Sequence, residues 1–257
     1  MITPLIGHLL AVCIGLSLGL LGGGGSILAV PILVYVMGVN SKVAIAMSLF
    51  IVGSVSLLGV IPYARHGRVS WRIAAGFIPT AMLGAYLGTQ LIRLPLITET
   101  VQLVSFGLVM LAASILMIRR GRRSVKPQSA QPQDAAAQPS VSWLILLEGL
   151  GVGIVTGFVG VGGGFLIIPA LVLLGGVPIK TAVGTSLLII AFNSATGFLG
   201  YLTQVSIDWG LTLPFTLAAG LGTLLGSRLS RIVSAEQLQK GFGYFVLAVA
   251  IFVLIRR

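Results

Sequence analysis

Residues 157–201 read GFVGVGGGFLIIPALVLLGGVPIKTAVGTSLLIIAFNSATGFLGY. In this stretch a glycine-rich break interrupts an apolar run. A proline, the sequence Lys-x-Ala-x-Gly-Thr-Ser-Leu and a further apolar segment follow the break. Residues 19–63 have the same order of features and read GLLGGGGSILAVPILVYVMGVNSKVAIAMSLFIVGSVSLLGVIPY. The chain therefore contains two copies of one unit, each with glycines inside an apolar segment.

The duplication keeps one register throughout, in which residues 15–93 align without gaps to residues 153–231. About a third of the positions in this repeat alignment are identical. Apolar segments often agree in Leu and Val by chance, but seldom in Gly, Pro, Lys, Tyr and Trp together, so the match indicates an internal repeat. Examples are Gly22, Pro31, Lys42, Tyr63 and Trp71, which match Gly160, Pro169, Lys180, Tyr201 and Trp209.

Composition places the chain in the membrane. Of its 257 residues, 56% are hydrophobic and 8% are charged, whereas a soluble domain carries about 25% charged residues. The single cysteine, Cys13, excludes a disulfide scaffold. The net charge of +11 comes from basic residues that lie between apolar runs. This placement is typical of cytoplasmic loops rather than of nucleic-acid binding. The sequence predicts an all-α polytopic membrane protein.

Apolar runs of about 20 residues predict spanning helices. The predicted spans are 43–63, 72–92, 101–118, 181–202, 209–227 and 241–255. Two longer runs, 3–38 and 141–176, are broken by glycine. Residues 121–140, rich in Pro, Gln, Ser and Ala, are predicted to form a flexible cytoplasmic linker between a first repeat (1–120) and a second repeat (141–257).

Charge distribution favours an inverted orientation of the two copies. Loop 64–72 carries Arg65, Arg68 and Arg72, whereas the corresponding loop 203–208 carries only Asp208. The positive-inside rule then places corresponding loops on opposite sides of the membrane. Each half would have three spans and a re-entrant pair at the break, giving six spans and two re-entrant hairpins. The alternative is eight spans and parallel copies, which Arg256 and Arg257 favour.

The segment 157–201 resembles the TauE/SafE family of membrane proteins, the sulfite or sulfonate exporters. The resemblance rests on the glycine break, the downstream Pro169 and the residues Lys180 to Leu187, and it extends over nearly the whole chain apart from the linker. It implies transport of small sulfur-containing or organic anions across the bacterial inner membrane. The first half departs from the pattern, because Ala46-Met47 replaces Gly184-Thr185. This departure predicts an asymmetric site.

The glycine breaks are the predicted substrate site. Paired, glycine-interrupted apolar segments mark the midplane site of repeat transporters. Open backbone and the N-terminus of a following helix present amides to an anion. The predicted binding residues of the breaks are Gly23, Gly24, Gly25, Ser26, Gly162, Gly163 and Gly164. Glycines outside the breaks are predicted to serve close helix packing instead; these are Gly15, Gly19, Gly84, Gly88, Gly153, Gly157, Gly222 and Gly226.

Polar side chains on the following helices complete the predicted site. The adjacent residues Thr185 and Ser186 lie eight and seven residues, or about two turns, before Asn193. They are therefore expected to share a face with Asn193 and to orient the anion through hydroxyl and amide donors. Ser48 is the counterpart of Ser186 in the first half. The alternative role for all four is bonding to backbone carbonyls or to neighbouring helices.

Glu148 is the candidate for proton coupling, because it lies in the apolar sequence VSWLILLEGLGVG before the second break and intramembrane acids are costly. The alternative is an interfacial acid close to the linker. Tyr63, Tyr201, Trp71 and Trp209 flank predicted spans and are expected to anchor the protein at the membrane interfaces.

No nucleotide-binding, metal-binding or nucleophile–histidine–acid pattern occurs in the sequence. We therefore expect no enzyme activity, no cofactor, no metal and no nucleic-acid partner. The predicted function is secondary transport of a small organosulfur anion by a multi-pass inner-membrane protein, with a homo-oligomer left open. The alternatives are a passive anion channel and a membrane scaffold or biogenesis subunit.

Overall fold

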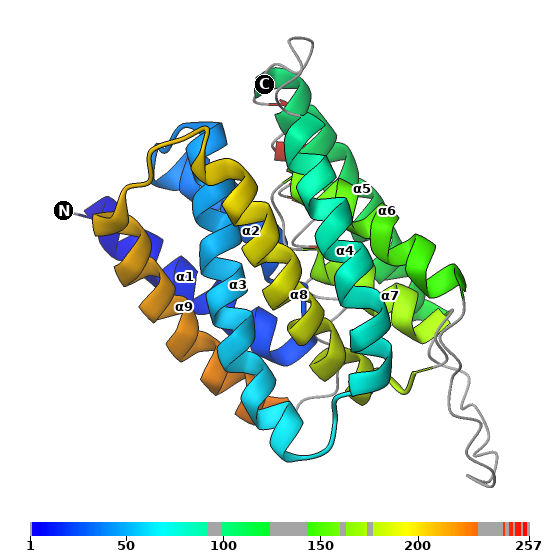
Figure 1. The fold of residues 1–257 in the computed structure, drawn as a ribbon. Coiled ribbons are helices and arrows are strands. Elements are labelled where there is room, and N and C mark those ends of the chain that lie inside the picture. Colours follow the sequence, from blue (N-terminus) through cyan, green and yellow to red (C-terminus); the bar gives the residue numbers. More distant parts are fainter. Residues whose placement is uncertain are drawn as a thin grey trace, which may run out of the picture.

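The computed structural model of the chain describes residues 2–91, 99–123, 143–159, 163–173 and 177–230, with single helical positions between 244 and 255. Its regular structure is helical throughout the described residues, as predicted (Figure 1). The first half contains α1 (Ile2–Leu21), α2 (Ser26–Pro31), a π-helical continuation η1 (Ile32–Val36), α3 (Ser41–Arg65), α4 (Trp71–Leu91) and α5 (Glu99–Arg123). The second half contains α6 (Trp143–Val159), α7 (Gly164–Leu173), α8 (Ile179–Leu202) and α9 (Trp209–Leu229).

The predicted spans up to residue 227 fall on α3, α4, α5, α8 and α9. Three described helices are long and apolar enough to cross a membrane, namely α3, α9 and Lys180–Leu202 of α8. Most of the predicted linker lies outside the described residues, since α5 continues to Arg123 and the description resumes at Trp143. About half of the predicted span 241–255 also lies outside them, and its described positions are helical.

Helix bounds follow the repeat alignment. Trp71 and Leu91, the ends of α4, align with Trp209 and Leu229, the ends of α9. The first residue of α3, Ser41, likewise aligns with the first residue of α8. Side chains cap the starts of α3 and α9. Asn40 accepts a hydrogen bond from the N–H of Lys42, and Asp208 accepts one from the N–H of Leu211.

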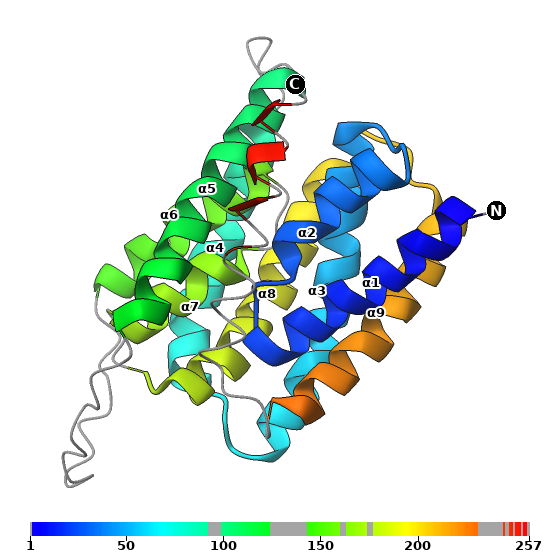
Figure 2. The ribbon, with the colours of Figure 1, turned by 180° about the vertical axis from the view of Figure 1, so that it is seen from behind.

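The α3 and α8 helices pack against each other in an antiparallel pair (Figure 1). Gly59 lies against Leu187, and Gly197 lies against Leu49. Residue numbers therefore rise along α8 where they fall along α3, which shows that the two helices run in opposite directions. These two contacts are each other's counterparts in the repeat alignment. Helices α1 and α9 flank this pair on one side, and α4 and α6 flank it on the other, which the reverse view also shows (Figure 2).

The flanking helices form two parallel pairs, each joining one helix from either half. In the α1–α9 pair, Gly15 lies against Ala219 and Gly19 against Thr223. In the α4–α6 pair, Gly153 lies against Ala81 and Gly157 against Ala85. A side chain at any of these glycines would overlap the backbone of the partner helix, so the packing role predicted for them is confirmed.

Candidate functional site

The two glycine breaks meet inside the protein. The first lies between the end of α1 at Leu21 and the start of α2 at Ser26, and the second lies between Val159 of α6 and Gly164 of α7. Gly23 of the first break packs backbone to backbone against Gly164. Gly22 and Gly163 have φ angles of +68° and +80°. Residues other than glycine rarely adopt this backbone conformation. The breaks therefore use glycine both for their turns and for their contact.

One face of α8 lies across both breaks. Val183 packs on Gly22 and Ile190 packs on Gly164. Between them, the hydroxyl of Ser186 lies 2.6 Å from the carbonyl oxygen of Gly22 and 2.8 Å from that of Val183, and these two acceptors share its one proton. Positions 183, 186, 190 and 193 recur at the helical period, so Asn193 continues the same face. As predicted, Ser186 and Asn193 share a face.

Asn193 forms a buried polar pair with Thr156 of α6. The Thr156 hydroxyl donates to the carbonyl oxygen of Gly153 at 3.0 Å, so it accepts the hydrogen bond from Asn193 Nδ2 at 2.6 Å. Thr156 in turn packs on Gly163 of the second break. The remaining amide oxygen, Asn193 Oδ1, has no partner among the described residues although the side chain is only 1% exposed. A buried acceptor without a partner is rare in folded proteins, and a water or a donor group of a ligand would satisfy this one.

The polar pair has no counterpart in the first half. The positions aligned with Thr156 and Asn193 in the repeat are Leu18 and Val55, both apolar and buried. The two halves therefore differ beside the breaks, but through Asn193 and Thr156 and not through Thr185, on which the predicted asymmetry rested. Sequence reasoning missed Thr156. Its signal was the departure from the repeat, a polar residue where the first copy has Leu18.

The other predicted residues of the first break lie around the contact. Ser26 donates to the carbonyl oxygen of Gly23 at 2.8 Å, and Gly25 packs against Ile14 and Leu18 of α1. Residues from Gly22 through Pro31 are all buried, which includes Gly24. Ser48 on α3 is fully buried and donates to Ile45 of its own helix at 2.8 Å. Gly162 lies outside the described residues.

Thr185 is not brought to the breaks. Its hydroxyl accepts a hydrogen bond from the N–H of Ser70 at 2.9 Å and donates to the carbonyl oxygen of Thr181 at 2.8 Å. The preceding Gly184 packs against the carbonyl oxygen of Arg68. Gly184 and Thr185 thus hold the loop between α3 and α4 against α8.

The prediction that Tyr63 and Tyr201 anchor the protein at the membrane interface is wrong, because both side chains are buried. Tyr63 is 6% exposed and Tyr201 is 1% exposed. Tyr63 donates to the carbonyl oxygen of Gly19 at 2.9 Å, and Tyr201 donates to that of Phe158 at 3.2 Å. Each phenol therefore binds the last turn of the helix that precedes a glycine break. Trp71 and Trp209, by contrast, are 62% and 44% exposed.

Glu148 lies on α6, five residues after the helix begins at Trp143. It is partly exposed and makes no hydrogen bond or ion pair within the described part of the chain. Eight residues, or about 12 Å along the helix axis, separate it from Thr156. Among the described residues, no group of three or more His, Cys, Asp or Glu side chains lies close enough to hold a metal ion.

Comparison with known proteins gives the family. Residues 8–253 match the sequence profile of a family described as sulfite exporter TauE/SafE. A probable membrane transporter protein of Xylella fastidiosa (strain 9a5c) is 39% identical over 249 residues, which cover 95% of this chain and 92% of that protein. The probable membrane transporter protein YunE of Bacillus subtilis (strain 168) is 29% identical over 82% of this chain and 83% of its own. No solved structure matches the chain.

The apolar helices and these relatives agree on a membrane protein. The family match covers both halves of the chain, including the two glycine breaks and the helices that pack on them. By this match and by its 39% identity to the Xylella protein, the chain belongs to the TauE/SafE family.

Proposed function

We propose that this protein is a secondary transporter that moves small organosulfur or organic anions, such as a sulfonate or sulfite, across the bacterial inner membrane. Its relatives are named probable membrane transporter proteins, and its family is described as a sulfite exporter family. The observation that carries the proposal is the contact of Gly23 with Gly164, beside which the Ser186 hydroxyl and the Asn193 amide group are buried.

The two halves, residues 1–120 and 141–257, act in this proposal as inverted repeats. The argument is the antiparallel packing of α3 against α8, which are counterparts in the repeat alignment. Two equivalent helices that run antiparallel are related by a two-fold axis across their length. If α3 and α8 both span the bilayer, that axis lies in the membrane plane, which defines an inverted repeat. Each break then forms a re-entrant hairpin with the short helix after it.

The anion binds between the breaks. The first N–H groups of α7 have no partner within that helix and present a partial positive charge. From α8, Ser186 would turn its hydroxyl from the carbonyl oxygen of Gly22 to the anion. The Asn193 amide would donate its second N–H, beside the one that binds Thr156. These partners would offset the cost of taking an anion out of water without a buried cation. Because the second half alone has the Asn193–Thr156 pair, it makes the larger contribution to binding.

Access to this site requires movement. Ser186 is fully buried and Asn193 is 1% exposed, so neither side chain is reached by solvent in the present arrangement. Alternating access would open the site by displacement of the α1–α9 and α4–α6 pairs relative to the α3–α8 pair. Glu148, on the α6 helix that carries Thr156, is the proposed proton carrier for coupled transport.

Uptake by purified protein in proteoliposomes tests the proposal. Labelled sulfite, thiosulfate, taurine and sulfoacetate would be supplied with and without an imposed pH gradient. We expect saturable uptake of at least one anion that is accelerated by unlabelled anion on the opposite side. Uptake without saturation or such acceleration would indicate a channel. No uptake of any of the four by folded protein would favour a scaffold or biogenesis role.

A further inference from the structure

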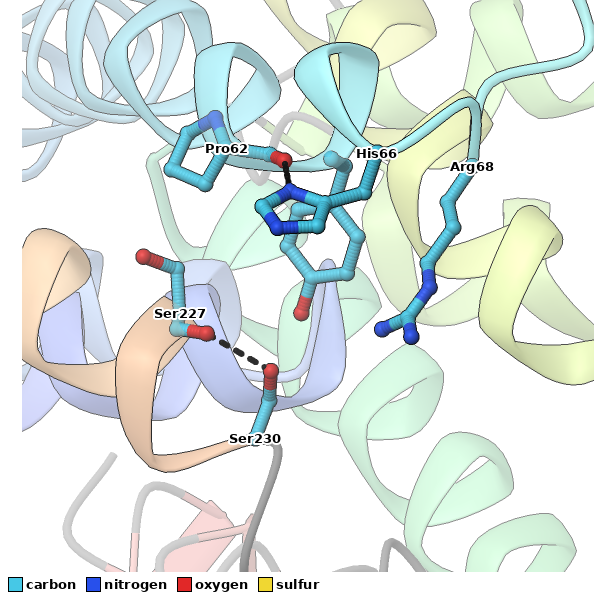
Figure 3. Close-up of a pocket in the computed structure, with 6 residues that line it drawn as sticks. Pro62, His66, Arg68, Ser227 and Ser230 are labelled. Atoms are coloured by element: carbon cyan, nitrogen blue, oxygen red, sulfur yellow. Dashed lines mark hydrogen bonds between the residues drawn. The ribbon is translucent and has the colours of Figure 1, made fainter.

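A small pocket with room for about one water molecule lies at the end of the molecule where α3 and α9 terminate (Figure 3). It is formed by the last turns of these helices and by the loop between α3 and α4. Its lining residues are Pro62, Tyr63, His66, Arg68, Ser227 and Ser230. Figure 3 shows the guanidinium of Arg68 directed into the same space as the hydroxyl of Ser230. None of the described residues that line the pocket is acidic.

The position of Arg68 is fixed by α8. Its carbonyl oxygen packs against Gly184, and two residues later the N–H of Ser70 donates to Thr185 at 2.9 Å. The ring of His66 is held in a similar way, because its Nδ1 lies 2.6 Å from the carbonyl oxygen of Pro62, to which it donates. The loop between α3 and α4, which carries Arg68, is therefore held against α8 by two contacts, one at Gly184 and one at Thr185.

Tyr63 connects the pocket to the first glycine break. Its side chain forms one wall of the pocket, and its phenol donates to the carbonyl oxygen of Gly19 at 2.9 Å. Gly19 lies three residues before Gly22, whose carbonyl oxygen accepts from Ser186. A single buried side chain thus separates the pocket from the backbone of the proposed transport site.

Arg68 forms no ion pair with another residue of the described part of the chain. The ends of α3 and α9 each bring the partial negative charge of a helix C-terminus to this region. Arg65 in the last turn of α3 and Arg228 in the last turn of α9 counter those partial charges. Neither of them lines the pocket, so Arg68 supplies its positive charge. A guanidinium presents several N–H donors in a plane that matches the oxygens of an oxyanion.

The corresponding position at the opposite end of the molecule lacks this charge. The counterparts of Pro62, Tyr63, His66 and Arg68 in the repeat alignment are Gly200, Tyr201, Gln204 and Ser206. Tyr201 keeps the hydrogen bond to the turn before its glycine break. The tyrosine between pocket and break is therefore common to both ends, whereas the arginine occurs at one end only.

We propose that the Arg68 pocket is a loading site in which Arg68 binds an oxygen of the substrate's oxyanion group before the substrate passes Tyr63 to the glycine breaks. This inference rests on the proposed transport function. By the positive-inside rule, the end that carries Arg65, Arg68, Arg72 and Arg228 faces the cytoplasm. The pocket thus lowers the KM for substrate offered from the cytoplasmic side and leaves the KM for the other side unchanged.

The test compares Arg68→Gln with Arg65→Gln, a matched control that removes a nearby charge outside the pocket. Saturation curves for a transported sulfonate are measured in inside-out and right-side-out membrane vesicles. For Arg68→Gln we expect a KM raised by about fivefold to tenfold in inside-out vesicles only, the size expected for one exposed charge-assisted hydrogen bond. Arg68→Lys should recover part of the loss, and Arg65→Gln should match the wild type.

Ser206→Arg provides a second, gain-of-function readout, since it places a guanidinium at the opposite end, where the counterpart of Arg68 is uncharged. We expect this variant to lower the KM in right-side-out vesicles. Equal effects of Arg68→Gln and Arg65→Gln, or an equal change at both faces, would overturn the inference. So would an Arg68→Gln effect seen in vesicles of anionic lipid but not of neutral lipid, which would assign the pocket to a lipid phosphate. Absence of transport by the wild type would instead refute the proposed function.

Discussion

Gly23 and Gly164 come from opposite halves of the chain, and their backbones are in direct contact. A Cβ atom on either residue would overlap the other. The centre of the protein is therefore built from main chain, and the side chains that could bind a substrate there are contributed by the helices around it. Ser186 and Asn193 of α8 are the polar residues on the face that covers this contact.

Substitution Gly23→Ala should abolish transport and lower the melting temperature. Overpacking at a tight contact costs about 1–3 kcal/mol, and the two breaks would be forced apart. Gly151→Ala is the matched control, because a Cβ atom at Gly151 meets nothing within 4 Å. Replacing a helical glycine by alanine there should raise stability by up to about 1 kcal/mol. Uptake and thermal unfolding in detergent would be measured for both variants. Normal transport by Gly23→Ala would refute the role of the contact.

Two kinds of buried serine should respond in opposite ways to alanine. Ser186→Ala removes the hydrogen bond to Gly22 and leaves a buried carbonyl unpaired, which costs about 1–3 kcal/mol. Ser56 and Ser194 are also fully buried, but their hydroxyls have no partner among the described residues. Their replacement by alanine should leave the free energy of unfolding unchanged or raise it, because an unsatisfied polar group is removed. A loss of stability in Ser56→Ala equal to that in Ser186→Ala would contradict this assignment.

The helix positions could be predicted from the sequence because each long helix coincides with an uninterrupted apolar run. The run 209–227 became α9, and 72–92 became α4, with end shifts of one or two residues. Which helices would pair could not be predicted. A repeat shows that two segments are equivalent but does not say which partners their glycines face, so the parallel α1–α9 and α4–α6 pairs appeared only in the structure.

The sequence could predict which helix carries the polar residues of the candidate site, but not which of them face the glycine breaks. Thr185 and Ser186 are adjacent, so their side chains point about 100° apart on a helix. Ser186 lies against Gly22, whereas Thr185 lies against Ser70. The sequence predicts Tyr63 and Tyr201 at the membrane interface because both lie at the ends of predicted spans. Their phenols instead bind backbone carbonyls inside the protein, an outcome that depends on neighbours distant in sequence.

The polar pair of the second half should be dispensable for folding and required for binding. The double variant Asn193→Val with Thr156→Leu installs the residues found at Val55 and Leu18. Because both partners of the hydrogen bond are replaced together, we expect a change of less than about 1 kcal/mol in the free energy of unfolding. Transport should be lost, since the second half no longer offers Asn193. Thermal unfolding and uptake would be measured on the same preparation. If the double variant were stable and kept the wild-type KM, Asn193 would not be part of the substrate site.

Corresponding loops should lie on opposite sides of the membrane. Arg65 and Thr203 are counterparts in the repeat alignment, and both are exposed. In a Cys13→Ser background, Arg65→Cys and Thr203→Cys would each be labelled with a membrane-impermeant maleimide in intact cells and in inside-out vesicles. We expect Thr203→Cys to react in intact cells and Arg65→Cys to react only in inside-out vesicles. Labelling of both from one side would establish parallel repeats and the count of eight spans.

Glu148→Gln tests whether transport is coupled to protons. Glutamine has nearly the same shape as glutamate but cannot bind and release a proton, so it should support exchange of anion while removing the response to a pH gradient. Asp208→Asn is the control, because asparagine also caps helices and should preserve the hydrogen bond to Leu211. Uptake would be measured with an imposed gradient, without one, and as exchange at equal pH on both sides. If Glu148→Gln kept gradient-stimulated uptake at the wild-type rate, Glu148 would not be the proton carrier. If Asp208→Asn also lost the stimulation, the effect could not be assigned to Glu148 alone.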